Sequence, residues 1–141
     1  MDSDNTSKQK NLDCMVCGEH YHGFETLSLS FIDKMDGTVT TSFLVASQYQ
    51  GYQGIMQGGL VSTLLDETMT QCLFSQGIKA LTAELRVRFI MPVRVGMQIS
   101  LEARLLSCKR SIYHVEAFVT HNKIVLSRAT AKFIEPKNVF T

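Results

Sequence analysis

Residues 48–67 read QYQGYQGIMQGGLVSTLLDE, and the pattern of the whole chain changes within this stretch. Glycines interrupt its first half, and a helical period begins at Leu60. At 100° per residue, the side chains that share this period fall within an arc of about 140° on one face of a helix. They are Leu60, Val61, Leu64, Leu65, Thr68 and Cys72. Because Gly77 is typical of the residue that follows a helix, the sequence predicts one long helix over residues 59–76.

Two strands are predicted before this helix. A period-2 pattern starts at Phe24, and its apolar positions lie on one face of the first strand. These positions are Leu27, Leu29 and Phe31. A turn at Asp36-Gly37 follows, since glycine accepts positive φ. The next strand has its own apolar face, formed by Val39, Phe43 and Val45. We expect the two strands to form a hairpin.

Four more strand patterns follow the helix, over residues 79–91, 97–109, 112–121 and 124–135. In the first of them, one face is apolar and the other polar. Leu81, Ala83, Leu85, Val87 and Phe89 alternate with Thr82, Glu84, Arg86 and Arg88. Strands joined by short turns pair antiparallel, and a single helix has to bury its apolar face against one side of the sheet. The predicted fold is therefore α+β, with the order β-β-α-β-β-β-β.

Length and composition favour a single globular domain. The 141 residues are 45% hydrophobic and 19% charged, and a chain of this size buries about two thirds of its unfolded surface. A net charge of +1 is too small for binding to a phosphate backbone, and no apolar run of roughly 18 residues predicts a membrane span. The polar start is unlike a secretion signal, so the four cysteines are expected to be reduced. We expect a cytoplasmic protein without nucleic-acid or membrane partners, with a tail at residues 1–22 and the domain at 23–141.

The N-terminal end of the predicted helix is a candidate binding and catalytic site. Gly58 and Gly59 let the backbone come close to a ligand, and the free N–H groups there carry the positive end of the helix dipole. Such a pair can polarise a carbonyl and hold an oxyanion. Two turns further on, Asp66 lies at the margin of the apolar arc between Ser62 and Thr70, which makes it a candidate base or nucleophile. The alternative is an ordinary helix with a glycine-rich entry and a solvent-facing Asp66.

Two motifs resemble those of the hotdog-fold acyl-CoA thioesterases of the PaaI-like, 4-hydroxybenzoyl-CoA thioesterase superfamily. In that family, His-Gly-Gly is followed by Asp at the ninth position after the His, and here Gln57-Gly58-Gly59 is followed by Asp66 at that position. Residues 82–96, TAELRVRFIMPVRVG, resemble the family's third strand and its Pro-x-x-x-Gly turn. The resemblance covers roughly residues 24–135. It implies the hotdog fold, an antiparallel sheet wrapped around one long helix.

The resemblance also implies a role for each matching residue. Asp66 resembles the family's carboxylate nucleophile or general base. Gly58 resembles the backbone donor to the thioester carbonyl, and Gly59 assists it. Gln50 resembles the polar side chain that positions the attacking water or the carbonyl. Thr82 resembles the hydroxyl residue at the start of the third strand that holds the water.

Three further residues are candidates for substrate binding. Thr70 matches a hydroxyl one turn after the carboxylate in some members of the family. Arg88 belongs to a set of basic residues that either keep a sheet face solvated or meet the phosphates of coenzyme A. Gln57 stands where the family has His, and glutamine forms hydrogen bonds but cannot carry a proton at neutral pH.

The function implied by the resemblance is hydrolysis of an acyl-CoA thioester to a free acid and coenzyme A, without a metal or an organic cofactor. The alternative is a non-catalytic acyl-CoA-binding hotdog domain, which Gln57 favours. Gly58 and Asp66 lie about 12 Å apart along one helix axis, too far to act on one carbonyl. We therefore expect a homo-oligomer in which two chains share each active site. The resemblance implies the same arrangement, as a dimer or as a dimer of dimers, a homotetramer.

The N-terminal part contains a second motif, with spacing typical of metal ligands. Cys14 and Cys17 form a Cys-x-x-Cys pair, and His20 and His22 follow closely enough to complete a zinc site. The alternative is a segment that packs beside the first strand without a metal, as similar N-terminal segments do in PaaI-like proteins. The four residues are weak candidates, and no metal is expected.

Overall fold

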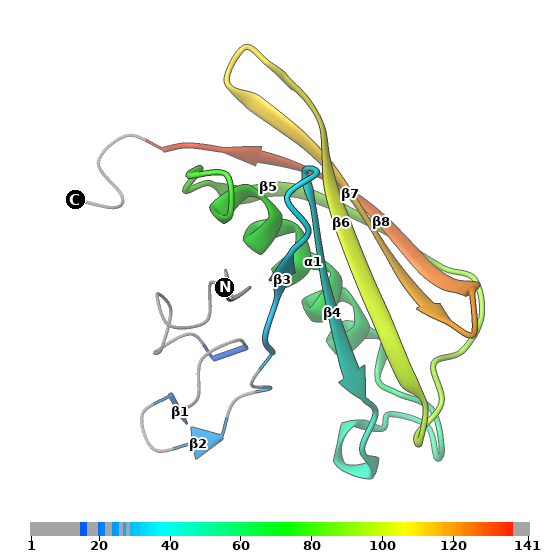
Figure 1. The fold of residues 1–141 in the computed structure, drawn as a ribbon. Coiled ribbons are helices and arrows are strands. Elements are labelled where there is room, and N and C mark those ends of the chain that lie inside the picture. Colours follow the sequence, from blue (N-terminus) through cyan, green and yellow to red (C-terminus); the bar gives the residue numbers. More distant parts are fainter. Residues whose placement is uncertain (1–14, 17–19, 22–23, 26, 28, 137–141) are drawn as a thin grey trace.

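The computed structural model describes residues 15–16, 20–21, 24–25, 27 and 29–136 of the chain. Within them, a six-stranded antiparallel sheet curves around one long helix, α1 (Figure 1). The strands follow the order β3-β4-β6-β7-β8-β5 across the sheet. The α+β prediction and the hotdog arrangement of one helix and six strands are confirmed.

The strands of the sheet lie on both sides of α1 in the sequence. They are β3 (Ile32–Asp33), β4 (Thr38–Leu44), β5 (Leu81–Phe89), β6 (Gln98–Lys109), β7 (Ile112–His121) and β8 (Ile124–Ile134). A short 3-10 helix, η2 (Ser47–Tyr49), precedes α1 (Gly58–Phe74), and a separate pair is formed by β1 (His20–Tyr21) and β2 (Phe24–Glu25). In the described part of the chain, no helix has both the length and the apolar character needed to cross a bilayer.

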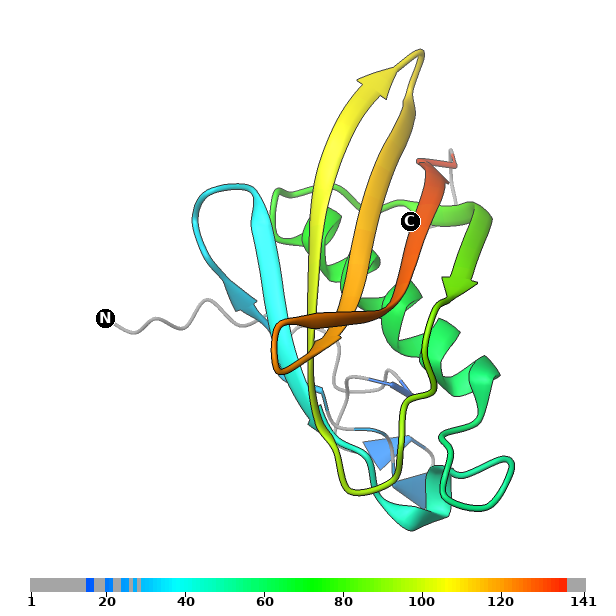
Figure 2. The ribbon, with the colours of Figure 1, turned by 90° about the vertical axis from the view of Figure 1, so that its right-hand side faces the viewer.

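The core lies between α1 and the inner face of the sheet (Figure 2). The helix contributes Leu64, Leu65, Met69 and Leu73, which are fully or almost fully buried. The inner face of the long strands contributes Ile99, Leu101, Val115, Ala117, Val119, Ala129, Ala131 and Phe133. Burial of the apolar arc is what holds a helix of this length in place, because helix propensity alone contributes little. The helix begins and ends within two residues of the predicted bounds.

The first predicted strand is mostly absent. Only Ile32–Asp33 pairs with β4, although Leu29 and Phe31 are buried as their pattern predicted. The reason lies in the backbone partners of the preceding residues. The Leu29 N–H donates to the Val16 carbonyl, and the Ser30 carbonyl accepts from the Thr41 hydroxyl. The Leu29 N–H and the Ser30 carbonyl therefore do not pair with β4, although the side chains of Leu29 and Phe31 remain buried. The β1–β2 pair was not predicted.

One irregularity in the sheet affects the position of a candidate residue. β5 pairs with β8 at the edge of the sheet, and its register shifts between Thr82 and Glu84. Residues directly opposite each other in an antiparallel pair share one face. Thr82 is opposite buried Phe133, and Leu85 is opposite buried Ala131, so both side chains face the helix. A regular strand would have placed them on opposite faces, so the prediction that Thr82 shares the polar face of this strand is wrong.

Candidate active site

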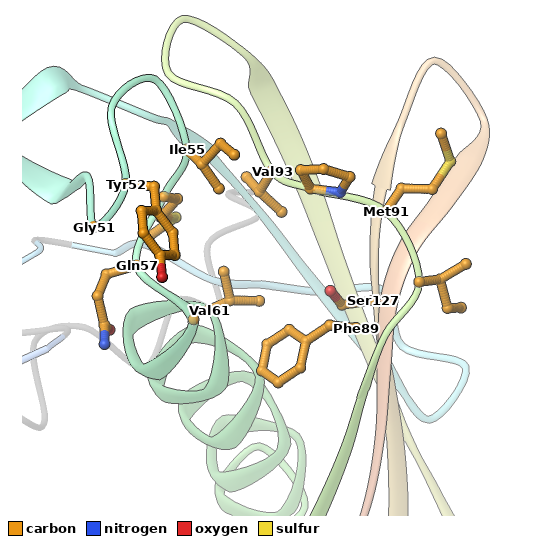
Figure 3. Close-up of a pocket in the computed structure, with 13 residues that line it drawn as sticks. Gly51, Tyr52, Ile55, Gln57, Val61, Phe89, Met91, Val93 and Ser127 are labelled. Carbon is orange, nitrogen blue, oxygen red and sulfur yellow. The ribbon is translucent and has the colours of Figure 1, made fainter.

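A cavity of about 760 Å³ opens at the N-terminal end of α1 (Figure 3). The loop before the helix forms one side, the first turn of α1 forms the floor, and the segment after β5 forms the other side. The lining residues are Gly51, Tyr52, Ile55, Met56, Gln57, Gly58, Val61, Phe89, Ile90, Met91, Pro92, Val93 and Ser127. Most of these are apolar, as is usual for cavities that bind organic ligands.

Backbone hydrogen bonds hold the two sides of this cavity together. The Met56 N–H donates to the Val93 carbonyl at 2.7 Å, and the Gln57 N–H donates to the Tyr49 carbonyl at 2.8 Å. Gln57 is the N-cap residue of α1, and its side-chain Oε1 accepts a hydrogen bond from the Leu60 N–H at 3.0 Å. Gln57, which stands where the thioesterase motif has His, therefore caps the N-terminus of α1.

The two glycines at the helix entry differ in the space around them. A Cβ on Gly59 would lie 2.8 Å from Gln57 Oε1, so a side chain there would displace the capping amide. A Cβ on Gly58 would meet only the Phe89 ring, at 3.6 Å from Cζ, which is ordinary van der Waals contact. The N–H groups of both glycines lie in the first turn, where a helix offers no acceptor. Within residues 29–136, neither N–H has a backbone acceptor, and Gly58 is the one of the two that lines the cavity.

Asp66 lies two turns further along α1 and is half-buried. The Thr82 hydroxyl of β5 donates a hydrogen bond to Asp66 Oδ1 at 2.6 Å. Burial raises the pKa of the Asp66 carboxyl above its ordinary value, and the hydrogen bond from Thr82 partly offsets that rise. A desolvated carboxylate with one fixed hydroxyl donor has the character of a general base or nucleophile. The structure thus brings together Asp66 and Thr82, which are 16 residues apart in the sequence.

The remaining predicted residues lie at different distances from this pair. The Gln50 Oε1 atom accepts from the Gly54 N–H at 3.0 Å, so its amide is turned toward its own loop. The Thr70 hydroxyl donates to the backbone carbonyl of Asp66 at 3.0 Å and stays against the helix. Arg88 is exposed on the outer face of β5, opposite Arg128 of β8. Their proposed roles remain predictions.

Of the residues that line the cavity, only Gln57 and Gly58 were predicted as site residues from the sequence. Ser127 and Phe89 are cross-strand partners on the inner faces of β8 and β5, and both line the cavity. A signal for Ser127 exists, because it continues the alternation of Ala129, Ala131 and Phe133 on the inner face. A hydroxyl at a core-facing position of a strand is a polar group that needs a partner.

Most of the predicted metal motif lies outside the described residues. Cys14, Cys17 and His22 lie outside the described residues, and only the backbone of His20 is described, in β1. Among the residues that are described, no group of three or more His, Cys, Asp or Glu side chains could hold a metal ion.

Comparison with known proteins places these features in a family. The family model "Thioesterase superfamily" matches residues 53–127, a range that includes the helix entry, Asp66 and Thr82. Rat (Rattus norvegicus) acyl-coenzyme A thioesterase THEM4 is 27% identical over 107 residues, which are 74% of this chain and 46% of that protein. The mouse (Mus musculus) THEM4 protein is 25% identical over the same shares of both chains. The chain thus spans about half the length of the curated relatives that it matches.

Solved structures show the same fold at lower identity. The smu.793 protein of Streptococcus mutans, solved bound to acetyl-CoA, has a TM-score of 0.72 at 21% identity, over 82% of this chain and 94% of that one. The PaaI protein of E. coli, from the phenylacetic acid degradation operon, has a TM-score of 0.73 at 16% identity, over 77% of this chain and 84% of that one. With the family model covering more than half of its residues, the chain belongs to the thioesterase superfamily.

Proposed function

We propose that this protein hydrolyses acyl-CoA thioesters to a free acid and coenzyme A. The observation that carries the proposal is the half-buried Asp66 carboxylate of α1, which accepts a hydrogen bond from the Thr82 hydroxyl of β5. The first residue of the same helix, Gly58, lines an apolar cavity. The names of the related rat and mouse proteins, and the acetyl-CoA bound to the smu.793 protein, support acyl-CoA as the substrate.

In the proposed reaction, the thioester carbonyl accepts hydrogen bonds from the N–H groups of Gly58 and Gly59. These donors stabilise the negative charge that develops on the carbonyl oxygen, with help from the helix dipole. Asp66 takes a proton from an attacking water, the carbon–sulfur bond breaks, and the coenzyme A thiolate leaves with that proton. If Asp66 instead attacks the carbonyl carbon, the thiolate leaves and takes a proton from solvent, and water then hydrolyses the acyl–Asp66 anhydride to the free acid and the Asp66 carboxylate. Thr82 orients Asp66, and Gln50 positions the water once its amide turns from the loop.

We infer that each site is built by two copies of the chain. Gly58 and Asp66 are eight residues apart, or about 12 Å along α1, whereas reacting atoms approach to roughly 3–3.5 Å. Two antiparallel α1 helices at a two-fold axis would bring Gly58 of one copy beside Asp66 of the other. The edge strand β5 supports this, because its large apolar side chains are exposed. Together with the segment that follows, these are Leu81, Leu85, Phe89, Ile90 and Met91. Such dimers would form tetramers by pairing.

Arg88 is proposed to bind a phosphate of coenzyme A. It lies directly opposite Arg128 in the β5–β8 pair, and like charges at opposite positions repel each other. Neither arginine has a carboxylate partner among the residues described. An anion between the two guanidinium groups would remove this repulsion, and a phosphate fits their paired donors.

The test of the proposed function is a panel of acyl-CoA thioesters with a thiol-release assay. We expect steady release of coenzyme A from at least one acyl class, and loss of that release when Asp66 is replaced by Asn. Tight binding of acyl-CoA without release would instead support the non-catalytic acyl-CoA-binding domain. The cytoplasm remains the expected location on the sequence argument, and fractionation of cells that express the protein tests it.

A further inference from the structure

Ser127 is a buried hydroxyl at the back of the candidate active site. It lies on the inner face of β8, has 0% of its surface exposed and lines the cavity at the entry of α1. Among the residues that the structure describes, its Oγ atom has no hydrogen-bond partner. In folded proteins nearly all buried side-chain oxygens have one, because an unpaired polar atom loses its water without compensation. A residue that only fills the core at this position would be expected to be Ala, as at Ala129 and Ala131 on the same face.

The neighbours of Ser127 exclude a role as nucleophile in this arrangement. A serine hydroxyl becomes a nucleophile when an adjacent base accepts its proton. In the described part of the chain, no base forms a hydrogen bond with Ser127 Oγ. The hydroxyl can still donate one hydrogen bond and accept others. The chemistry open to it is therefore recognition of a polar atom on a ligand.

The Phe89 side chain lies between Ser127 and Gly58, the residue proposed to bind the thioester carbonyl. The two residues are direct partners in the β5–β8 pair, so their side chains share the inner face. Both point toward α1 (Figure 3). The tip of the Phe89 ring is the group nearest to the position of a Cβ on Gly58, at 3.6 Å. One phenylalanine side chain thus extends from beside Ser127 to Gly58, a path of about six carbon atoms from Cα to Cζ.

We propose that Ser127 determines specificity for acyl groups that carry an oxygen, as a hydroxyl or keto group, about six carbons from the thioester. The inference rests on the proposed acyl-CoA function, with the thioester carbonyl at Gly58. The acyl chain lies along the Phe89 ring, and its far oxygen pairs with the Ser127 hydroxyl. Because Ser127 is fully buried, the ligand reaches its hydroxyl only when the Phe89 ring turns aside.

The experiment compares matched ligands that differ in one oxygen. Hydrolysis of 6-hydroxyhexanoyl-CoA and hexanoyl-CoA is measured for the wild type and for Ser127→Ala. We expect the wild type to favour the hydroxylated substrate by roughly fivefold or more in kcat/KM, since a site built to bond a polar group rejects the analogue that lacks it. Ser127→Ala should bring that ratio close to one. Its melting temperature should stay the same or rise, because the variant removes an unpaired buried oxygen.

The matched control is Ser100→Ala, which removes an exposed serine hydroxyl of β6 outside this cavity. It should keep the wild-type preference. A ratio near one in the wild type overturns the proposal, as does a preference that Ser127→Ala retains. A marked fall in the melting temperature of Ser127→Ala also overturns it, since that result shows a structural hydrogen bond.

Binding of two thioethers separates this inference from the proposed function. S-hexyl-CoA and S-(6-hydroxyhexyl)-CoA cannot be hydrolysed, and calorimetry gives their Kd values for each variant. Tighter binding of the hydroxylated thioether that depends on Ser127, without thiol release from any thioester, refutes hydrolysis and supports the role of Ser127. Hydrolysis of both substrates with equal binding of both thioethers supports the proposed function and refutes the role of Ser127.

Discussion

The Thr82 hydroxyl donates a hydrogen bond to Asp66 Oδ1 at 2.6 Å, and a β-bulge makes this contact possible. The register of β5 shifts immediately after Thr82, so this threonine faces α1 together with Leu85. Bulges commonly re-aim one side chain next to a functional site. The candidate carboxylate is thereby held by a residue from the edge strand of the sheet.

Replacing Asp66 by Asn is expected to abolish hydrolysis without unfolding the protein. Asn keeps the size of the side chain and still accepts the Thr82 hydrogen bond, but it is neither a base nor a nucleophile. The rate of thiol release should fall by about a hundredfold or more. Binding of the thioether S-hexyl-CoA should stay near the wild-type level. Turnover close to that of the wild type would contradict the assignment of Asp66.

The same variant should change how stability depends on pH. Because burial raises the pKa of Asp66 in the folded protein, its charged form is less favourable there than in the unfolded chain. The wild type therefore loses stability as the pH rises from below the unfolded pKa, about 3.9, through the raised folded pKa. Asp66→Asn should match the wild type at about pH 3 and be more stable near pH 7. Denaturant unfolding at both pH values measures this difference. A lower stability of the variant at pH 7 would contradict a raised pKa of Asp66 in the folded protein.

Thr82→Ala should move the acid limb of the pH–rate profile to higher pH. The Thr82 hydrogen bond lowers the pKa of Asp66 and opposes the effect of burial. Without it, the pKa of Asp66 rises further, and the carboxylate needed for catalysis forms at higher pH. Thr82→Ser keeps the hydroxyl and should keep the profile. If kcat/KM of Thr82→Ala depended on pH in the same way as that of the wild type, Thr82 would not act through Asp66.

Gly58→Ala is expected to fold normally and to lose activity. The added Cβ meets only the Phe89 ring at an ordinary contact distance, and alanine favours the helical state more than glycine does. The methyl group would nevertheless stand beside the N–H that is proposed to receive the thioester carbonyl. Thermal unfolding should give an unchanged or higher Tm, and the thiol-release assay a large loss of kcat/KM. Full activity at an unchanged Tm would remove Gly58 from the site.

Gln57 provides a prediction about stability and one about catalysis. Gln57→Ala removes the hydrogen bond to the Leu60 N–H and should cost about 1 kcal/mol of unfolding free energy. Gln57→His restores the pattern of the resembling family and should keep or raise the rate of thiol release. Loss of activity in Gln57→His at an unchanged melting temperature would show that the glutamine amide has a role of its own.

Mixed oligomers test whether two copies share each site. Asp66→Asn and Gly58→Ala chains are each expected to be inactive alone. When they are unfolded together and refolded, a mixed dimer regains one site with an intact Gly58 and an intact Asp66. Part of the thiol-release activity should therefore return. Absence of rescue in mixed dimers verified by mass spectrometry would refute the shared site, as would a catalytically active monomer by light scattering.

Local patterns in the sequence were sufficient for the framework of this protein. The helix is readable because its apolar residues recur with the helical period, and it begins and ends within two residues of the predicted bounds. The long strands after it are readable because their inner positions alternate and their connections are short. The nine-residue spacing between Gln57 and Asp66 lies on one helix, so the sequence alone also relates the two ends of the candidate site.

The tertiary structure decided the features that depend on pairing between distant segments. Strict alternation places Thr82 on the polar face of its strand, and only the register against β8 shows that the bulge turns it toward Asp66. The first predicted strand is short because the carbonyl of Ser30 is bound by the Thr41 hydroxyl. The alternation of β8 places Ser127 on the inner face, but only the tertiary structure shows that its oxygen lies unpaired at a cavity, among the residues described. Each of these depends on contacts between segments far apart in the chain, and a local period carries no information about them.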